Sequence, residues 1–272
     1  MKIYFLIVLI LSLFIASCSQ FGENPSGEHL EKIKISPNYS IEKERFTNRI
    51  ENIFDKMREK DSFWNNPQKR ISQNYFFNSA ETIPENKLPE VKPPNIKDFL
   101  KSTGSIKFIW FGHSTILVNI RNTIILIDPV FSKAASPVSF LVQRFQPPVL
   151  ELKDLPKIDY VLISHDHYDH LDMETMIFFK EKDVKFIAPL GVTSHLKSWG
   201  INESKLFEGD WWDIIEFDGI TFICTPAQHF SGRLGTLNYS KTLWASWIVK
   251  SESKSFYFNG DSGYDVHYKK IG

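Results

Sequence analysis

The feature that most constrains this chain is a group of histidine and aspartate residues that directly follows a short apolar segment. Tyr160 to Ile163 form the apolar segment, and residues 164–170 then read Ser-His-Asp-His-Tyr-Asp-His. A short apolar run of this kind is typical of a buried strand. Imidazole and carboxylate groups at this density are typical of a divalent-metal site, and α/β proteins bind ligands at strand ends. The pattern therefore predicts a buried strand whose end carries a metal centre.

Short apolar runs continue beyond Ser105. Strands are predicted at residues 106–111, 115–120, 123–127, 160–163, 185–188, 221–225, 244–249 and 255–258. Helices are predicted at residues 173–181 and 192–199, between some of these strands. Strands interleaved with helices indicate a mixed α/β layer structure rather than an all-β sandwich.

The N-terminus, MKIYFLIVLILSLFIASC, has the layout of a secretory signal: a positive charge, an apolar run over residues 3–16 and a small residue before Cys18. A membrane-spanning helix is the alternative, but a helical run of this length rises only about 21 Å, short of a roughly 30 Å hydrocarbon core. Residues 13–18 resemble a bacterial lipobox. The resemblance implies that Cys18 is lipidated and anchors an exported protein to a membrane of the bacterial cell envelope.

Composition divides the chain into successive parts. Residues 1–17 would be a lipoprotein signal peptide, and residues 18–38, polar and rich in turn formers, a tether between membrane and domain. Residues 39–104 would form an N-terminal helical and extended segment, because helical spacing of apolar residues predicts a helix over 40–60 and clustered prolines then predict an extended connection. Residues 105–272 would form the compact domain.

The composition argues against nucleic-acid binding and excludes a disulfide scaffold. Lys plus Arg (32) equals Asp plus Glu (32), so the chain lacks the positive field on which nucleic-acid binding depends. The only cysteines are Cys18 and Cys224. With Cys18 lipidated, Cys224 has no partner, and its apolar neighbours predict that it is buried in a strand.

Two further polar residues follow predicted strands. His229 ends the segment Thr-Pro-Ala-Gln-His, and Asp261 lies within Phe-Asn-Gly-Asp-Ser-Gly. Together with residues 164–170, they resemble the signature of the metallo-β-lactamase superfamily. The stretch from Ser105 to Tyr264 is similar to its branch of N-acylphosphatidylethanolamine-hydrolysing phospholipases D and their bacterial relatives, in the segments WFGHST (110–115), IDPVF (127–131), HFSGR (229–233) and TLWASW (242–247). The resemblance implies a metallo-β-lactamase-like αββα sandwich.

The resemblance also implies a two-zinc centre. It makes His165, His167 and His229 the ligands of one zinc, Asp169 and His170 ligands of the second, and Asp261 the bridge between them. Such a centre lowers the pKa of bound water to about 7 and would direct a metal-bound hydroxide at a phosphodiester, with Asp169 and Asp261 as catalytic carboxylates. A di-iron redox site of this superfamily would carry a glutamate in place of His167, so a hydrolase is favoured over an oxidoreductase.

His113 and Arg233 are predicted to bind substrate. His113 lies within the segment at 110–115, and Arg233 follows the ligand His229 closely enough to grip a phosphate with its guanidinium. The alternatives are a hydrogen-bonded core histidine and a surface salt bridge, respectively. Two other histidines, His29 and His195, are expected to face solvent.

The resemblance weakens near the C-terminus. The family supplies a further histidine to the second zinc beyond the bridging aspartate, whereas this sequence ends at Gly272 and its last histidine, His267, lies in a Lys-rich stretch unlike the family's position. The second half of the sandwich and the second zinc site are therefore expected to be incomplete, as in a fragment or a truncated gene product.

The leading functional hypothesis is a lipid-anchored, zinc-dependent phosphodiesterase of the N-acylphosphatidylethanolamine phospholipase D type, acting on a phospholipid or another phosphodiester. A lactonase-type metallohydrolase of the same fold is one alternative, because fold and zinc ligands do not determine the substrate. A catalytically dead, truncated lipoprotein is the other alternative.

Overall fold

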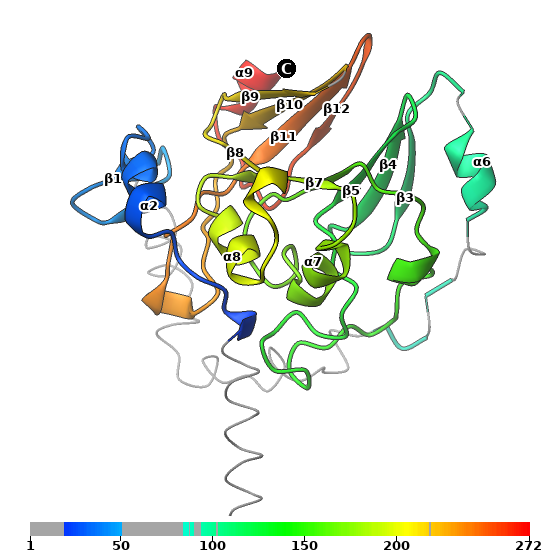
Figure 1. The fold of residues 1–272 in the computed structure, drawn as a ribbon, viewed down its shortest axis with the longest axis horizontal. Coiled ribbons are helices and arrows are strands. Elements are labelled where there is room, and N and C mark those ends of the chain that lie inside the picture. The colour runs from blue at the N-terminus through cyan, green and yellow to red at the C-terminus, as the bar shows by residue number, and fades with distance from the viewer. Residues whose placement is uncertain (1–18, 51–83, 87, 90–93, 102, 218) are drawn as a thin grey trace, which may run out of the picture.

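The computed structural model describes residues 19–50, 84–86, 88–89, 94–101, 103–217 and 219–272. Two β-sheets dominate this part of the chain, with strand orders β3-β4-β5-β6-β7-β8 and β12-β11-β10-β9 (Figure 1). The strands of the larger sheet are β3 (Lys107–Trp110), β4 (Ile116–Ile120), β5 (Thr123–Ile127), β6 (Tyr160–Leu162), β7 (Lys185–Pro189) and β8 (Leu206–Gly209). Those of the smaller sheet are β9 (Ile214–Phe217), β10 (Ile220–Thr225), β11 (Ser246–Ser251) and β12 (Lys254–Phe258).

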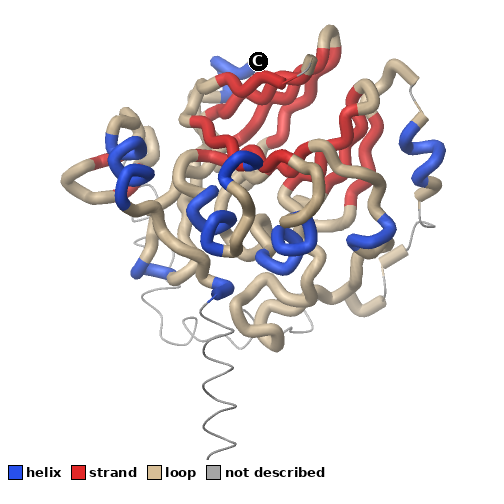
Figure 2. The backbone as a smooth tube through the Cα atoms, viewed as in Figure 1, coloured by secondary structure: helices blue, strands red, loops and turns tan. Residues whose placement is uncertain are grey.

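The helices are short. In Figure 2 some of them lie with long loops below the larger sheet, and others lie at the left, right and top of the molecule. The α-helices are α2 (Gly27–Lys34), α6 (Ile96–Leu100), α7 (Met173–Phe179), α8 (Thr193–Ser198) and α9 (Tyr268–Ile271). Single 3-10 turns are η1 (Leu152–Asp154), η2 (Glu203–Lys205) and η3 (Gly235–Leu237). The strands β1 (Tyr39–Ser40) and β2 (Arg45–Phe46) form a separate small ribbon.

The larger sheet changes from antiparallel to parallel at β5. β3, β4 and β5 pair in antiparallel fashion, whereas β5, β6, β7 and β8 pair in parallel. Parallel strands need crossover connections, and the helices α7 and α8 supply them on the outer face of the sheet. The whole of β6 is buried as a result, which explains the uninterrupted apolar run from Tyr160 to Ile163.

The two sheets pack face to face through a shared apolar layer. Its buried side chains include Val118, Ile120, Ile125, Ile127, Leu162, Phe222, Cys224, Trp247 and Val249. Trp247 of β11 is fully buried, and its indole N–H donates a hydrogen bond of 2.9 Å to the carbonyl of Ile163. This bond ties the smaller sheet to the end of β6, at the point where the loop of residues 164–170 begins.

The predicted α/β fold class is confirmed. Each predicted strand segment beyond Ser105 contains a strand, and both predicted helices form. Cys224 is a free, buried cysteine within β10, as expected. β8 and β9 were not predicted from the sequence. Both lie at sheet edges, and all of their residues except Gly209 are partly or largely exposed, so the apolar signal is weak.

The segment expected to be a tether is folded onto the domain instead. Helix α2 buries Ile33 completely against the domain. The indole of Trp199 donates to the carbonyl of Ser19 at 2.7 Å, and His29 lies 2.7 Å from the carboxylate of Glu208. The polar composition predicted a tether, but polar side chains and backbone carbonyls of this segment contact the domain surface.

The helix expected over residues 40–60 is absent from its described part. Residues 39–46 form the β1-β2 ribbon, in which Tyr39 pairs with Phe46. The two rings meet edge to face at 5.3 Å, and Phe46 is almost fully buried. Contact with the domain therefore overrides the helical spacing. Residues 51–60 lie outside the described residues, as do the predicted signal peptide and Cys18.

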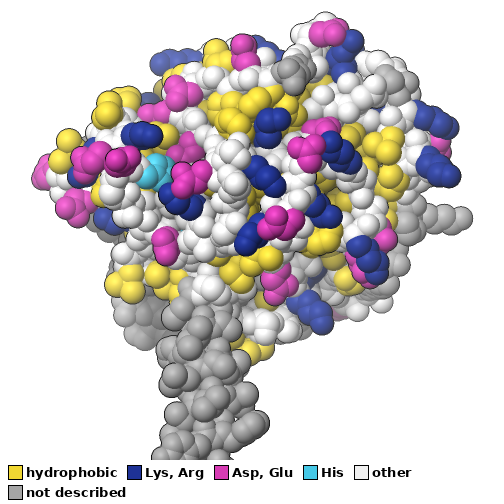
Figure 3. Space-filling view, in the orientation of Figure 1, with side chains coloured by type: hydrophobic (Ala, Val, Ile, Leu, Met, Phe, Trp, Pro, Cys, Tyr) yellow, Lys and Arg dark blue, Asp and Glu magenta, His cyan; other side chains and the backbone are white. Residues whose placement is uncertain are grey.

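Within the described part of the chain, no helix has the length and apolar character that crossing a membrane would need. On the face drawn in Figure 3, basic and acidic side chains are interspersed, in line with the equal numbers of both in the sequence.

Candidate metal centre

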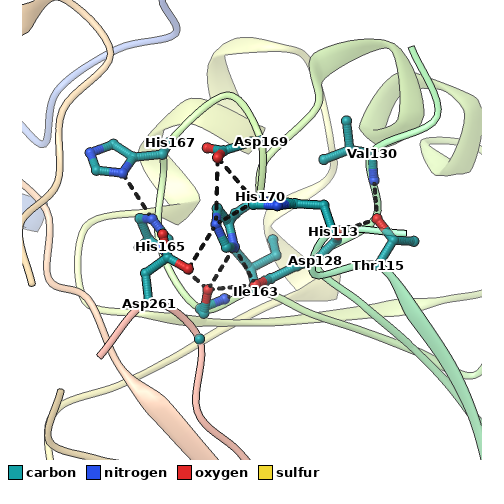
Figure 4. Close-up of polar contacts among 12 residues, drawn as sticks. His113, Thr115, Asp128, Val130, Ile163, His165, His167, Asp169, His170 and Asp261 are labelled. Carbon is teal, nitrogen blue, oxygen red and sulfur yellow. Dashed lines mark hydrogen bonds and ion pairs between the residues drawn. The ribbon is translucent and has the colours of Figure 1, made fainter. Parts of the chain in front are cut away.

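The predicted ligands come together at one edge of the sandwich, where strand ends of both sheets meet (Figure 4). The loop between β6 and α7 supplies His165, His167, Asp169 and His170. His229 follows β10 and Asp261 follows β12. These six side chains form donor groups that could hold a metal ion.

The first donor set consists of three imidazoles. The Nε2 atom of His165 lies 2.9 Å from Nδ1 of His167, which lies 3.2 Å from Nε2 of His229. Ligands about 2.0–2.1 Å from a tetrahedral ion lie about 3.3–3.4 Å from one another, so this spacing fits a zinc-sized ion. Burial lowers the pKa of His165, and it lowers the pKa of His229 to about 3. Both rings are therefore neutral at physiological pH, the form that binds metals.

The second donor set contains His113, Asp169 and His170. The Nε2 atom of His113 lies 3.0 Å from Oδ2 of Asp169 and 3.3 Å from Nε2 of His170. Asp261 lies between the two sets, with Oδ1 at 3.3 Å from Nε2 of His170 and Oδ2 at 3.8 Å from Nε2 of His229. A carboxylate with one oxygen toward each set has the position of a bridging ligand.

Asp128 contacts the ligand His170 directly and the ligand His165 through Ser164. Its Oδ2 atom lies 2.8 Å from Nδ1 of His170, and its two oxygens accept hydrogen bonds from the amide and hydroxyl of Ser164. The hydroxyl of Ser164 also lies 2.9 Å from Nδ1 of His165. Such contacts orient ligand rings. Asp128 lies within the matching segment IDPVF (127–131), but this orienting role was not predicted from the sequence.

The charge around His170 favours a cation. Burial alone would lower the pKa of His170, but hydrogen bonds to Asp128 and Asp261 raise it to about 10. Asp169 is held well below its usual pKa, although burial opposes this, because His113 and His170 lie beside it. The carboxylates of Asp128, Asp169 and Asp261 surround the imidazole of His170 and thus favour positive charge there. A divalent ion would supply this charge.

On the side of the loop that faces away from the donor sets, Asp166 contacts the rest of the domain. Asp166 is fully buried; its Oδ2 lies 3.1 Å from Nε2 of His195 and accepts from the hydroxyl of Thr242, while its Oδ1 accepts from the amide of Gly232. Despite burial, these contacts hold the pKa of Asp166 well below its usual value, with His195 as the main cause. The expectation that His195 faces solvent is wrong, because its side chain is fully buried.

Arg233 is not placed to bind substrate. Its side chain is buried, and the guanidinium donates to the carbonyls of Asp166 and Leu171 at 2.8 Å and to the carbonyl of Gln20 at 2.8 and 3.0 Å. It also lies 3.9 Å from the ring centre of Tyr168. Because backbone carbonyls occupy the guanidinium, neither the phosphate-binding role nor the surface salt bridge holds.

His267 lies apart from the donor sets. It contacts Ser262 at 3.4 Å and Asp265 at 4.0 Å and packs against Tyr268. The structure thus places His267 outside the donor groups found among the described residues. The expected incompleteness of the second half stays a prediction.

An apolar cavity of about 700 Å³ opens beside the second donor set. Its lining includes His113 and Asp169 from the centre, and mostly apolar side chains from β3 and from residues 130–149. Three aromatic side chains of this lining are largely exposed: Phe108 (70%), Trp110 (63%) and Phe145 (52%). Predominantly apolar cavities with a few convergent polar groups are typical of ligand sites.

A family model described as the beta-lactamase superfamily domain matches residues 123–271, more than half of the chain. The chain belongs to this family. Membership confirms the resemblance to the metallo-β-lactamase superfamily drawn from residues 164–170, and this fold family implies divalent-metal binding. The donor set of imidazoles and carboxylates fits that implication chemically. Zinc as the particular metal stays a prediction.

This chain is similar to several known proteins. It is 44% identical over 165 residues to an uncharacterized protein of Mycobacterium tuberculosis, covering 60% of this chain and 44% of that protein. It is 38% identical over 186 residues to N-acyl-phosphatidylethanolamine-hydrolyzing phospholipase D 1 of Caenorhabditis elegans, covering 64% and 52%. The chain thus spans about half the length of these relatives. Among solved structures, Igni18, a metallo hydrolase from Ignicoccus hospitalis, matches with a TM-score of 0.49 and 23% identity over 61% of this chain and 65% of that chain.

Proposed function

We propose that the protein is a metal-dependent phosphodiesterase whose substrate is a membrane phospholipid. The observation that carries this proposal is the apolar cavity that opens directly beside two donor sets bridged by Asp261. A cavity of this kind accommodates hydrocarbon, while a phosphodiester at its inner end reaches His113 and Asp169. The similarity to the phospholipase D of Caenorhabditis elegans supports this substrate class.

A pair of divalent ions, zinc in this proposal, would supply acidified water and a positive field for the displaced oxygen when bound. The residues of the chain set the positions. His165, His167 and His229 present neutral nitrogens, because burial lowers the pKa of each. Asp169 remains ionised, and Asp261 directs one oxygen to each donor set. The cavity orients the substrate, so that the apolar part lies away from the carboxylates.

Membrane anchoring is part of the proposal. Lipidation of Cys18 would place the exported protein on a membrane of the cell envelope. The next residue, Ser19, is already bound to the domain through Trp199. A lipid on Cys18 would therefore hold the domain close to the membrane surface rather than at the end of a long linker. The exposed aromatic rim of the cavity is compatible with a lipid surface.

Hydrolysis by the zinc-loaded full chain tests the substrate class. We expect hydrolysis of bis(p-nitrophenyl) phosphate and of N-acylphosphatidylethanolamine in vesicles, and none by His165→Ala. Phe145→Ser should reduce the vesicle rate more than the probe rate, because Phe145 lines the cavity. Ile41→Ser, a matched loss of an exposed apolar side chain (70% exposed) outside the cavity, should change neither rate. Hydrolysis of a lactone alone would favour the lactonase alternative, and no hydrolysis by metal-loaded protein would favour a binding role.

Labelling with palmitate tests the anchor separately. Cys18→Ser should leave the precursor unprocessed and without label, because the lipid has no other cysteine of the signal to join. Wild-type labelling of the serine variant would refute the assignment.

A further inference from the structure

We propose that His113 is a ligand of the second metal ion, together with Asp169 and His170. This inference rests on the metal binding in the proposed function and changes the role of His113 from substrate contact to metal ligand. The donor atoms of the three residues all lie within 4.8 Å of one another. In Figure 4 the side chain of His113 meets those of the neighbouring Asp169 and His170, which come from a different part of the chain.

The separations among the three donor atoms fit one shared ion. Nε2 of His113 lies 3.0 Å from Oδ2 of Asp169 and 3.3 Å from Nε2 of His170, while Oδ2 of Asp169 lies 3.9 Å from Nε2 of His170. These three values lie around the separation of about 3.3–3.4 Å expected between ligands of a tetrahedral ion. The rings of His113 and His170 meet at 69° rather than stacking, with Nε2 facing Nε2. Two facing nitrogens and a carboxylate oxygen form a site for a cation.

The backbone holds His113 in an unusual conformation that aims the ring at this point. His113 has a φ of +46°, in the left-handed region that few non-glycine residues adopt. The indole of Trp110 donates to the carbonyl of His113 at 2.7 Å, and the amide of Thr115 donates to the carbonyl of Gly112 at 3.1 Å. Residues kept in such conformations by their surroundings concentrate at functional sites.

The turn that carries His113 is joined to the residue that orients His170. The hydroxyl of Thr115 donates to the carbonyl of Asp128 at 2.8 Å and accepts from the amide of Val130 (Figure 4). The carboxylate of Asp128 lies against Nδ1 of His170. The hydrogen bond between Thr115 and Asp128 therefore links the segments that position the two imidazoles of the second donor set, as expected for ligands of a common ion.

The position of His113 also suits a ligand that borders the substrate. Half of its side chain is exposed, and it lines the apolar cavity together with Asp169. His170, by contrast, is fully buried. The second ion would therefore lie at the inner end of the cavity, with His113 on its open side.

Cobalt titration of the full chain tests the proposal. Wild-type protein should bind two Co²⁺ ions, and His113→Asn should bind the second at least about tenfold more weakly. Asparagine tolerates the left-handed conformation, so this substitution removes the imidazole without adding strain. Trp110→Phe, which loses only the bond to the carbonyl of His113, should weaken the second site less. His267→Asn, a histidine outside the donor sets, should keep wild-type affinities.

Nuclear magnetic resonance of the Co²⁺ protein gives an independent readout. His113→Asn should lose one cobalt-shifted imidazole N–H signal, while the signals of the first site remain. Unchanged second-site affinity with a raised KM would overturn the proposal and return His113 to substrate binding. A wild-type chain that binds one ion would overturn it as well. Failure to hydrolyse phosphodiesters, with the cobalt results as expected, would reject the proposed function and leave the ligand assignment intact.

Discussion

The loop at residues 164–170 and the N-terminal segment at residues 19–34 are both polar, yet different contacts hold them in place. In the loop, side chains make the contacts, both within the loop, as between His165 and His167, and with distant residues, as between His167 and His229. In the N-terminal segment, the carbonyls of Ser19 and Gln20 bind Trp199 and Arg233, at sequence separations of 180 and 213 residues. The difference shows that polar composition alone does not separate a binding site from a linker or a docked segment.

The two regions share one support. Arg233 donates to the carbonyl of Asp166 in the loop and to the carbonyl of Gln20 in the N-terminal segment. His195, which binds Asp166, also faces Gly22, where a Cβ atom would lie 2.3 Å from its Nδ1. We therefore expect substitutions of metal ligands to affect the loop alone, and substitutions of the shared support to affect both regions.

The largest expected effect comes from the first donor set. His165→Ala or His167→Ala should lower affinity for the first metal ion by more than about 100-fold, since each removes one of three nitrogens. Zinc content after dialysis against a mild chelator measures this. Hydrogen exchange of α2 should remain as in the wild type. Retention of the wild-type zinc content in either variant would contradict the ligand assignment.

The second-largest effect is expected at Asp128. Asp128→Asn should weaken metal binding by about 10- to 100-fold, because it alters the partner of His170 and of Ser164. A competition titration with a chromophoric chelator measures the change. Asp183→Asn is the matched control, since Asp183 is exposed and pairs only with Lys157 among the described residues. Equal affinities of both variants would show that Asp128 does not support the centre.

The third prediction addresses the shared support. Arg233→Met should reduce the free energy of unfolding by about 2–4 kcal/mol, because several buried carbonyls lose a charged donor. Urea denaturation measures the loss, and amides of α2 should exchange faster. The first site should still bind zinc, but more weakly, because Arg233 also holds the carbonyl of Asp166 in the loop. Arg121→Met, which removes a half-exposed partner of Glu252, should have little effect. Unchanged exchange in α2 would mean that Arg233 does not hold the N-terminal segment.

The smallest effect should be a pH dependence of the N-terminal segment. The hydrogen bond to Glu208 raises the pKa of His29, although burial opposes it. Docking of α2 should therefore be strongest below the unfolded histidine pKa of about 6.5 and weaken as the pH rises through the higher folded value. Exchange rates of α2, corrected for intrinsic exchange, should rise a few-fold over this range. His29→Asn should remove this dependence, and a persistent dependence would point to another group.

The sequence predicted much of the centre because its ligands lie close together or follow strands. Four ligands fall within residues 165–170, and His229 and Asp261 each follow an apolar run. Asp128 could have been assigned a role from its position directly after β5, beside the strand that carries the cluster. Arg233 could not, because the same residue type in the same place serves a phosphate or a buried carbonyl equally well.

Local pattern thus determined the strands of the sandwich and the chemistry of the donor sets, since apolar runs, imidazoles and carboxylates act through their nearest neighbours. Tertiary structure alone decided that residues 19–34 dock on the domain, that Tyr39 and Phe46 pair in a ribbon, and that His195 is buried against Asp166. It also decided that His113 meets Asp169 and His170. Apart from the pairing of Tyr39 with Phe46, these contacts join residues far apart in the chain, and only the folded domain brings them within bonding distance.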